Sequence, residues 1–397
     1  MALRHFFLLA LFFLAACAAP PISRPPAESV PPTESVPPTE SAPPAEPDFR
    51  EARGQEIWAY NAWWMGEAWR TYDLAAFQRL LFFDLEVGQD GRLENRHGWP
   101  ERWEALRRQA REARVPLDPV VTVLSRETFS AVFANPDARA RLAKEVVSVA
   151  RAASGVHLDV EIIGGGEDAA LEGYRRFVAD LRHSLDAPPR KILTAFVPAR
   201  NVLYGPRELG MLDAIVAQGY DVHWQGSPNT GPPVSLEGDS PAAWRSAAAN
   251  LARQGVPARK IVFSTPLYGY EWPTVSGDAR AATRAQAAII TYAPVPLSLL
   301  PDIRVNALSR ATEHGLRREG PTGAPWYAFR DRDGWRQGWF DDAVSLAPRL
   351  DFVQRGDYRG VALFVLGYDG GALLEAIQQR LRARSAAAGD GNPAASR

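Results

Sequence analysis

The stretch Ser154-Gly155-Val156-His157-Leu158-Asp159-Val160-Glu161 gives the strongest indication of how this chain folds. Successive side chains of a β-strand point to opposite faces. One face of this stretch is wholly apolar and consists of Val156, Leu158 and Val160. The other face consists of Gly155, His157, Asp159 and Glu161. The pattern predicts a strand that packs under helices on one side and carries two acids in line on the other.

The two acids are spaced for acid catalysis. A carboxyl that protonates a leaving oxygen must keep its proton at the working pH, and a negative neighbour raises its pKa. We therefore expect the charge of Asp159 to raise the pKa of Glu161. An Asp-x-Glu pair also arises by chance at strand ends, where the acids meet only solvent or an arginine, so a structural role remains the alternative.

Apolar β-rich runs alternate with amphipathic stretches along the chain. The predicted strands are 56–60, 80–85, 117–124, 156–161, 191–197, 213–220, 260–267 and 360–366. The predicted helices are 100–114, 136–153, 168–185, 240–254, 341–355 and 371–383. For the helix at 240–254 we expect Ser240 as N-cap and Pro241 at the first helical position.

Eight strands that alternate with helices predict an α/β fold, a (β/α)8 TIM barrel spanning residues 48–384. Active sites of such barrels lie at the C-terminal ends of the strands. The gap between the seventh and eighth strands is long. We expect residues 268–338 to carry more than one helix, and a small insertion at about 270–335 beside the barrel mouth.

The N-terminus has the features of a targeting segment. Arg4 and His5 precede an apolar run, and Leu14-Ala15-Ala16-Cys17 resembles the lipobox of bacterial lipoproteins. The resemblance implies a signal peptide over 1–17, lipidation of Cys17 and a chain anchored to a membrane of the cell envelope. Because Ala18 replaces the Asp that favours inner-membrane retention, we expect the outer membrane where the cell has one. A plain secretory signal is the alternative.

Two further segments lack core-forming residues. Residues 18–47 repeat Glu-Ser-Val-Pro-Pro-Thr at 28–33 and 34–39, which predicts a disordered, Pro-rich linker. The Ala/Gly-rich stretch 385–397 predicts a disordered tail.

Composition limits the possible partners. A net charge of −1 argues against nucleic-acid binding. Cys17 is the only cysteine, which excludes an intramolecular disulfide. With 6 His and no His/Glu pair at ligand spacing, we predict no metal and no organic cofactor. We also expect a monomer.

Several stretches together resemble glycoside hydrolase family 18, the chitinase-like family, and especially its bacterial cell-wall and spore-cortex branch. The strand-4 motif Asp-Gly-x-Asp-x-Asp-x-Glu corresponds to residues 154–161. Three further matches are Tyr220-Asp221, Pro266-Leu267-Tyr268-Gly269 and Gly338-Trp339-Phe340-Asp341-Asp342-Ala343. The last strand, 360–366, also fits, and the likeness covers about residues 55–383.

The resemblance implies substrate-assisted hydrolysis of an N-acetylated sugar polymer. Glu161 would be the acid and then the base, Asp159 would orient the acetamido group, and Tyr220 would donate to its carbonyl oxygen. The implied substrate-binding residues are Asp221, Trp224, Phe364, Tyr60, Tyr268 and Trp272.

The sequence departs from the family pattern at two site positions. His157 replaces the inner acid of the motif, and we expect it to hydrogen-bond Asp159 or to pair with it when protonated. Phe364 replaces the tryptophan that forms the floor of the cleaved sugar's subsite.

The leading hypothesis is an envelope-anchored glycosidase that cleaves β-1,4-linked N-acetylglucosamine in peptidoglycan or a chitin-like polymer. The alternative is a non-catalytic, lectin-like lipoprotein with the same cleft. The presence of His157 favours this alternative, whereas the presence of the acid Glu161 argues against it. An enzyme acting on other N-acetylated glycans is a third possibility.

Overall fold

The structure, a computed structural model, describes residues 54–162, 167–296 and 298–389, with side chains up to 382. The predicted signal peptide, the Pro-rich linker and Cys17 therefore lie outside the described residues. In the part of the chain that is described, no helix combines the length and the apolarity needed to cross a bilayer.

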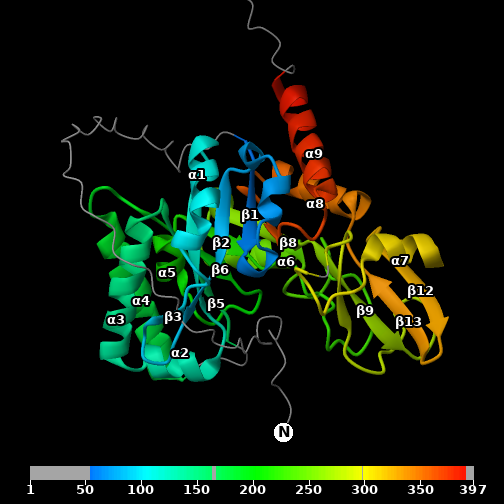
Figure 1. Cartoon of the computed structure of the whole chain (residues 1–397), viewed down its shortest axis with the longest axis horizontal. Coiled ribbons are helices and arrows are strands. Elements are labelled where there is room, and N and C mark those ends of the chain that lie inside the picture. Colours follow the sequence, from blue (N-terminus) through cyan, green and yellow to red (C-terminus); the bar gives the residue numbers. More distant parts are fainter. Residues whose placement is uncertain (1–53, 163–166, 297, 390–397) are drawn as a thin grey trace, which may run out of the picture. The chain divides into compact units, whose positions relative to one another are not determined.

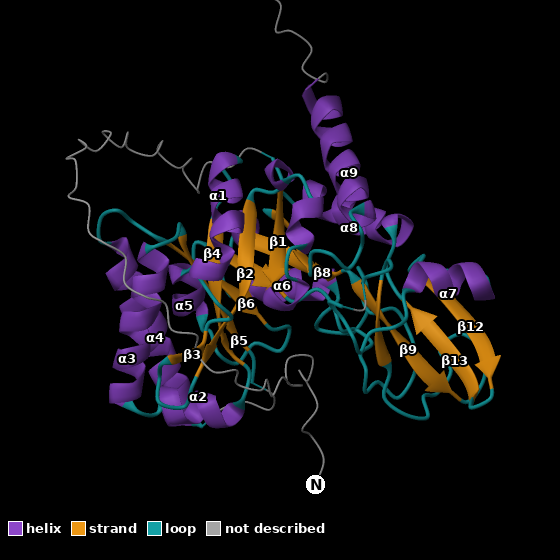
Figure 2. Cartoon of the chain, in the orientation of Figure 1, coloured by secondary structure: helices purple, strands orange, loops and turns teal. Residues whose placement is uncertain are grey.

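Eight parallel strands form a closed barrel (Figures 1 and 2). They are β1 (Glu56–Ala62), β2 (Arg79–Val87), β4 (Leu117–Val123), β5 (Gly155–Val160), β6 (Ile192–Val197), β7 (Ala214–Ala217), β8 (Ile261–Pro266) and β14 (Gly360–Phe364). The barrel closes because β1 pairs with β14 on one side and with β2 on the other. A short strand, β3 (Leu93–Asn95), pairs antiparallel with the end of β2. The predicted TIM barrel and its eight strands are confirmed.

Helices connect the barrel strands. They are α1 (Glu104–Glu112), α2 (Arg126–Phe133), α3 (Pro136–Arg151), α4 (Asp168–Asp186), α5 (Pro206–Met211), α6 (Trp244–Arg253), α8 (Ala343–Arg355) and α9 (Ala372–Gly389). Short 3-10 turns occur at Trp63–Met65, Ala68–Thr71, Leu74–Ala76, Glu101–Trp103 and Ala258–Lys260. The sequence did not predict α2 and α5, and α9 continues beyond its predicted end at 383.

Helix α3 shows how local sequence sets an element. The Asn135 side chain accepts from the N–H groups of Asp137 and Ala138, which caps the helix. Its predicted apolar stripe is buried, with Leu142 and Val146 at most 1% exposed. The helix packs against α4 on the outside of the barrel (Figure 1).

Helix α6 begins later than predicted. Ser240 and Pro241 form a turn, in which the Ala243 N–H donates to the Ser240 carbonyl, and the helix starts at Trp244. The Trp244 indole is fully buried and donates to the Gly219 carbonyl at 2.9 Å. This tertiary contact takes precedence over the local capping signal.

The insertion between β8 and β14 is mostly a second, antiparallel sheet. Its strands are β10 (Ala288–Thr291), β9 (Tyr268–Thr274), β13 (Gly334–Trp339), β12 (Pro325–Asp331) and β11 (Arg317–Arg318), in that order. Among the described residues of 268–338 there is one helix, α7 (Ala307–His314), so the expectation of several helices is wrong. Aromatic residues at alternate positions favour strands, for example Tyr268, Tyr270 and Trp272.

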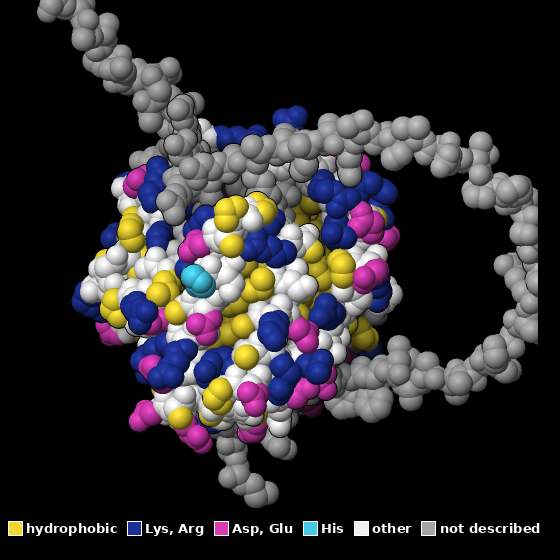
Figure 3. Space-filling model, turned by 90° about the vertical axis from the view of Figure 1, so that its left-hand side faces the viewer, with side chains coloured by type: hydrophobic (Ala, Val, Ile, Leu, Met, Phe, Trp, Pro, Cys, Tyr) yellow, Lys and Arg dark blue, Asp and Glu magenta, His cyan; other side chains and the backbone are white. Residues whose placement is uncertain are grey.

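Surface charges are mixed in sign. On the face shown in Figure 3, Lys and Arg side chains alternate with Asp and Glu, in keeping with the net charge of −1. The part of this face that the structure describes therefore shows both signs of charge together, which does not favour a polyanion there.

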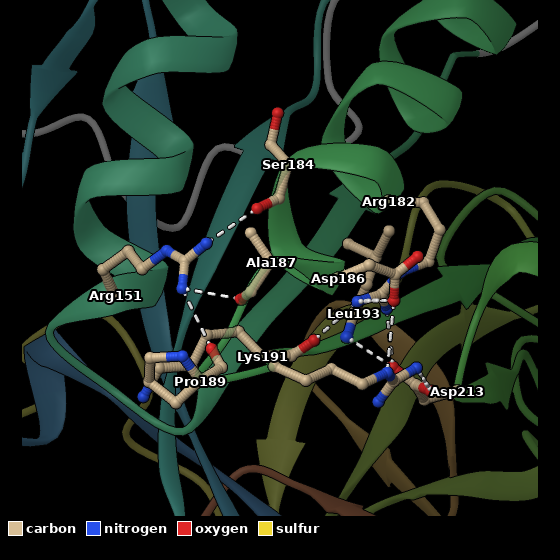
Figure 4. A network of polar contacts seen from close by, with 10 residues as sticks. Arg151, Arg182, Ser184, Asp186, Ala187, Pro189, Lys191, Leu193 and Asp213 are labelled. Atoms are coloured by element: carbon tan, nitrogen blue, oxygen red, sulfur yellow. Dashed lines mark hydrogen bonds and ion pairs between the residues drawn. The ribbon is translucent and has the colours of Figure 1, made fainter.

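A polar network joins α3 and α4 to the N-terminal ends of β6 and β7 (Figure 4). Arg151 donates to the carbonyls of Ser184, Ala187 and Pro189. Asp213 accepts from Arg182 at 2.8 Å and from the Leu193 N–H at 2.9 Å. The network ties strand ends together at the end of the barrel opposite to the acids of β5.

We predict that Asp213→Ala lowers the free energy of unfolding by about 3–5 kcal/mol, because it leaves the buried Arg182 guanidinium without its main partner. The matched control Asp186→Ala removes an exposed partner of the same arginine and should cost about 1 kcal/mol or less. Urea denaturation measures both. Equal losses would show that burial does not decide the strength of these pairs.

Candidate active site

The two acids of β5 lie at the C-terminal end of the barrel. Asp159 is opposite Thr122 of β4 and is 5% exposed. β5 ends at Val160, and the Glu161 N–H continues the ladder by donating to the Val123 carbonyl at 3.0 Å. Glu161 is half-buried. The site therefore has one acid inside the barrel end and one at its mouth.

Glu161 has the protonation behaviour of a general acid. Burial first, and the charge of Asp221 second, raise its pKa to about 7. The expected repulsion between Asp159 and Glu161 is present, and it contributes to the raised pKa of Asp159. Burial, followed by the charges of Glu161 and Asp84, raises the pKa of Asp159 well above its usual value. A carboxyl that keeps its own proton offers no charge to its neighbour.

One oxygen of Asp159 has no partner. Its Oδ1 atom is buried and makes no hydrogen bond within the described structure. An unsatisfied buried oxygen is costly, so a donor from a bound molecule would be stabilising there. This oxygen is therefore available as a hydrogen-bond acceptor at the barrel end.

Tyr220 and Asp221 follow β7 and come close to the two acids. Tyr220 is 7% exposed, and its pKa is raised well above the usual value by burial, then by the charge of Glu161. It therefore keeps its O–H proton and can donate. Asp221 adopts a left-handed backbone with φ of 64°, which Asp tolerates better than most residues.

The carboxylate of Asp221 is held by two tyrosines of β9. Tyr270 donates to Oδ1 at 2.6 Å and Tyr268 at 3.4 Å. Burial raises the pKa of Asp221 to about 6, while the tyrosine hydrogen bonds lower it. The sequence identified Tyr268, but it did not assign Tyr270 to the site. The second sheet thus supplies part of the site.

His157 does not contact Asp159 in the predicted way. Its Nε2 lies 3.1 Å from the Tyr60 hydroxyl and its Nδ1 lies 2.8 Å from Thr194 Oγ1. Burial first, and then the charge of Arg79, lower its pKa to about 3. The expected hydrogen bond or ion pair with Asp159 is replaced by a neutral imidazole that links β1, β5 and β6.

Aromatic rings line the barrel end near His157. Phe364 is half-buried, and its ring centroid lies 5.3 Å from that of Tyr60 and 5.4 Å from that of Phe83. Phe364 and Tyr60 were predicted from the sequence, whereas Phe83 was missed because it reads as ordinary strand core. Of the three rings, Phe364 is the one with appreciable exposure, and a sugar ring can stack on it. Tyr60 is 2% and Phe83 5% exposed, so these two rings pack against Phe364 and do not present a surface to a substrate.

The two predicted tryptophans differ in exposure. Trp224 is half-buried in the loop after β7. Trp272 is fully buried in β9, with its ring centroid 5.3 Å from that of Tyr270. The prediction that Trp272 contacts substrate is therefore wrong, since it packs behind Tyr270 and has no exposed surface.

Asp84 on β2 is a site residue that the sequence did not reveal. It is 3% exposed and accepts a hydrogen bond from Thr122 Oγ1 at 2.6 Å. Burial raises its pKa to about 6. Nothing in the sequence indicated this role because Asp84 lies in an apolar run, and only the strand order shows that a single strand, β4, separates it from β5.

Asp84 also has a His and Glu neighbour. His97 Nε2 lies 2.8 Å from Glu86 Oε1 and 3.7 Å from Asp84 Oδ1, and the His97 ring stacks on Trp63 at 4.0 Å. Ligand-type atoms of Asp84, Glu86 and His97 lie within 4.8 Å of one another. Hydrogen bonds account for this group, and we assign no metal to it.

Comparison with known proteins agrees with this arrangement. The family model of glycosyl hydrolases family 18 matches residues 122–369. The chain is 24% identical over 268 residues to the cortical fragment-lytic enzyme of Bacillus subtilis (strain 168), covering 62% of this chain and 56% of that enzyme. It is 22% identical over 222 residues to the cortical fragment-lytic enzyme of Bacillus anthracis, covering 53% of this chain and 46% of the relative. The chain thus spans about half the length of these curated relatives.

A solved structure shares the fold. The family 18 chitinase of Cycas revoluta in complex with (GlcNAc)3 superposes with a TM-score of 0.67 at 17% identity, covering 82% of this chain and 99% of that chain. The barrel, the acids at its C-terminal end and the family match over most of the chain lead to one assignment: this chain belongs to glycosyl hydrolases family 18.

Proposed function

We propose that this protein hydrolyses β-1,4-linked N-acetylglucosamine in a glycan by substrate-assisted, retaining catalysis. The observation that carries the proposal is the pairing of Glu161, whose pKa is raised to about 7, with the unpartnered buried oxygen of Asp159. The first group can donate a proton near neutral pH. The second can accept the N–H of an acetamido group.

The reaction divides into two steps. Glu161 protonates the glycosidic oxygen while the acetamido carbonyl oxygen attacks C1, so the C1–O bond breaks and an oxazolinium ion forms. Asp159 accepts the acetamido N–H, and Tyr220 donates to the acetamido oxygen. Water then attacks C1 and gives its proton to Glu161, which restores the acid. The substrate supplies the nucleophile, so one carboxyl serves as acid and base.

For the substrate we propose peptidoglycan, with chitin-like oligomers as the alternative. Two relatives are described as cortical fragment-lytic enzymes, and a chitinase with the same fold is described in complex with (GlcNAc)3. Asp221, Tyr268 and Phe364 would hold the sugar at the cleavage point, and Trp224 would extend the surface. We further propose that the protein acts as a monomer.

We propose that Cys17 carries a lipid that anchors the chain to the cell envelope, in the outer membrane where the cell has one. The support is the sequence Leu14-Ala15-Ala16-Cys17 followed by a Pro-rich stretch. Metabolic labelling with a fatty acid, compared between the natural chain and Cys17→Ser, tests the anchor. Equal labelling of both would contradict it.

A glycan-binding protein without catalysis is the second candidate. The observation that favours it is His157, whose neutral ring is bound to Tyr60 and Thr194 and offers Asp159 no charge. A lectin would keep the cleft and bind oligomers without cleaving them.

We predict that the purified protein releases fragments from N-acetylglucosamine oligomers and from purified sacculi, and that Glu161→Gln reduces the rate by at least about 100-fold, because general acid catalysis contributes about 10²–10⁴. Mass spectrometry of the products identifies the bond that is cut. The matched control is Glu172→Gln, which changes an exposed glutamate of α4 and should keep full activity. Binding without release at any pH would establish the lectin instead.

The raised pKa of Glu161 predicts the alkaline limb of the pH profile. The acid form persists up to about pH 7 in the free protein, so kcat/KM should fall as pH rises through that value. Since the charge of Asp221 raises the pKa of Glu161, Asp221→Asn should move this limb to lower pH. The position of the limb, rather than the height of the profile, is the measurement, because Asp221 also borders the substrate. A limb that stays in place would remove Asp221 as a source of the shift.

A further inference from the structure

Asp84, Thr122 and Asp159 lie on three adjoining strands at one end of the barrel. β4 pairs with β2 on one side and with β5 on the other. Thr122 is opposite Asp159 in the register, and its hydroxyl donates to Asp84 Oδ2 at 2.6 Å. Asp84 is 3% and Asp159 5% exposed, so both carboxyls are buried, and the charge of Asp84 acts on Asp159.

The proposed reaction, on which this inference rests, requires a change at Asp159. Burial and neighbouring charges favour a protonated Asp159 at rest. A carboxylate is the better acceptor for the acetamido N–H. The proton must therefore leave Asp159 when the substrate binds, while Glu161 keeps its own proton for the leaving oxygen.

His157 cannot take this proton readily. Both of its ring nitrogens are engaged, with Tyr60 at 3.1 Å and with Thr194 at 2.8 Å. A second proton on the ring would put an unpaired charge in the barrel interior, close enough to Arg79 for that cation to oppose it. Asp84 is a buried acid on β2, across β4 from Asp159. When an ionised carboxyl takes up a proton, a buried charge disappears, whereas protonation of His157 would create one.

We propose that Asp84 is a positioning residue, which takes up the proton that Asp159 gives up when an acetamido group binds. The O–H bond of Asp159 breaks and an O–H bond forms on Asp84. The movement reverses when the product leaves, and no proton is gained or lost by the pair. In the substrate complex Asp84 and Glu161 are neutral, and Asp159 is the one ionised acid of the three.

Several titratable groups surround the pair. Those that act on Asp84 are Glu86, His97 and, through mutual repulsion, Asp159. The groups that interact electrostatically with Asp159 are Glu161, Tyr60, Tyr174, Tyr204 and Tyr220. The tyrosines stay protonated because burial raises the pKa of each. The tyrosines therefore do not take part in the proposed exchange of a proton between Asp159 and Asp84.

The test follows both carboxyls by carbon-13 NMR of the full chain labelled at Asp side chains, with a chelator present throughout. Without ligand, Asp84→Asn should lower the pH at which Asp159 titrates by about one unit, since it removes a like charge. Glu94→Gln, an exposed acid on neighbouring β3, should leave the titration unchanged. An Asp159 titration that is the same in Asp84→Asn and in the natural chain overturns the inference.

A second variant keeps the acid itself. Thr122→Val removes the hydrogen bond that lowers the pKa of Asp84, so Asp84 becomes neutral over a wider pH range. Asp159 should again titrate at lower pH, by a smaller amount. This variant decides the question if Asp84→Asn does not fold, and an unchanged Asp159 titration overturns the inference here too.

The final step adds an N-acetylglucosamine oligomer to Glu161→Gln, which blocks turnover. The Asp159 signal should move to its ionised position and the Asp84 signal to its protonated one. Ionisation of Asp159 with no change at Asp84 overturns the inference. An oligomer that does not bind contradicts the proposed function, and the titrations without ligand still show whether the two acids are coupled.

Discussion

The candidate site depends on four carboxyls at one end of the barrel, of which Asp84 and Asp159 are buried and Glu161 and Asp221 are half-buried. Asp84, Asp159, Glu161 and Asp221 each have a raised pKa, and burial is the largest cause in every case. Burying an ionised acid without a partner is costly, so these groups keep protons to a higher pH than usual. Carboxyls of the site thus stay protonated at pH values closer to 7, and general acid catalysis requires such a protonated group.

The fold permits these raised pKa values because its buried arginines form ion pairs away from the site acids. The buried cation of the barrel interior, Arg79, pairs with Asp118 rather than with the site acids. Arg182 and Asp213 join strand ends on the opposite side. Around the acids, neutral donors take the place of cations: tyrosines hold Asp221, and a threonine holds Asp84. The Arg–Asp ion pairs thus contribute to stability, whereas the acids at the other end of the barrel have no lysine or arginine paired with them among the described residues and are available for proton transfer.

Much of the fold could be predicted from the sequence because its signals are local. Alternation around Asp159 identified β5, and apolar runs identified the other seven barrel strands. Gly155 is part of this local motif, but the reason for a glycine there is a tertiary contact. A Cβ at this position would lie 2.2 Å from the Ile192 carbonyl oxygen on the neighbouring strand. The insertion was misjudged because short aromatic runs fit helix or strand until their pairing is known.

The site was predictable where a residue sits in a strand-end motif, as Glu161, Tyr220 and Asp221 do. It was not predictable where the contact crosses strands. The role of Asp84 depends on β4 lying between β2 and β5, and the partners of His157 come from β1 and β6. The contribution of Asp221 to the raised pKa of Glu161 was missed for the same reason, because Asp221 reaches Glu161 from the loop after β7.

In the proposed reaction the acetamido group of the substrate, held by Asp159, acts as the nucleophile. Time-resolved proton NMR of an N-acetylglucosamine oligomer during hydrolysis tests this step. We expect the new reducing end to appear first as the β-anomer, because two displacements at C1 retain the configuration. An α-anomer formed first would show a single displacement by water and would rule out the acetamido nucleophile.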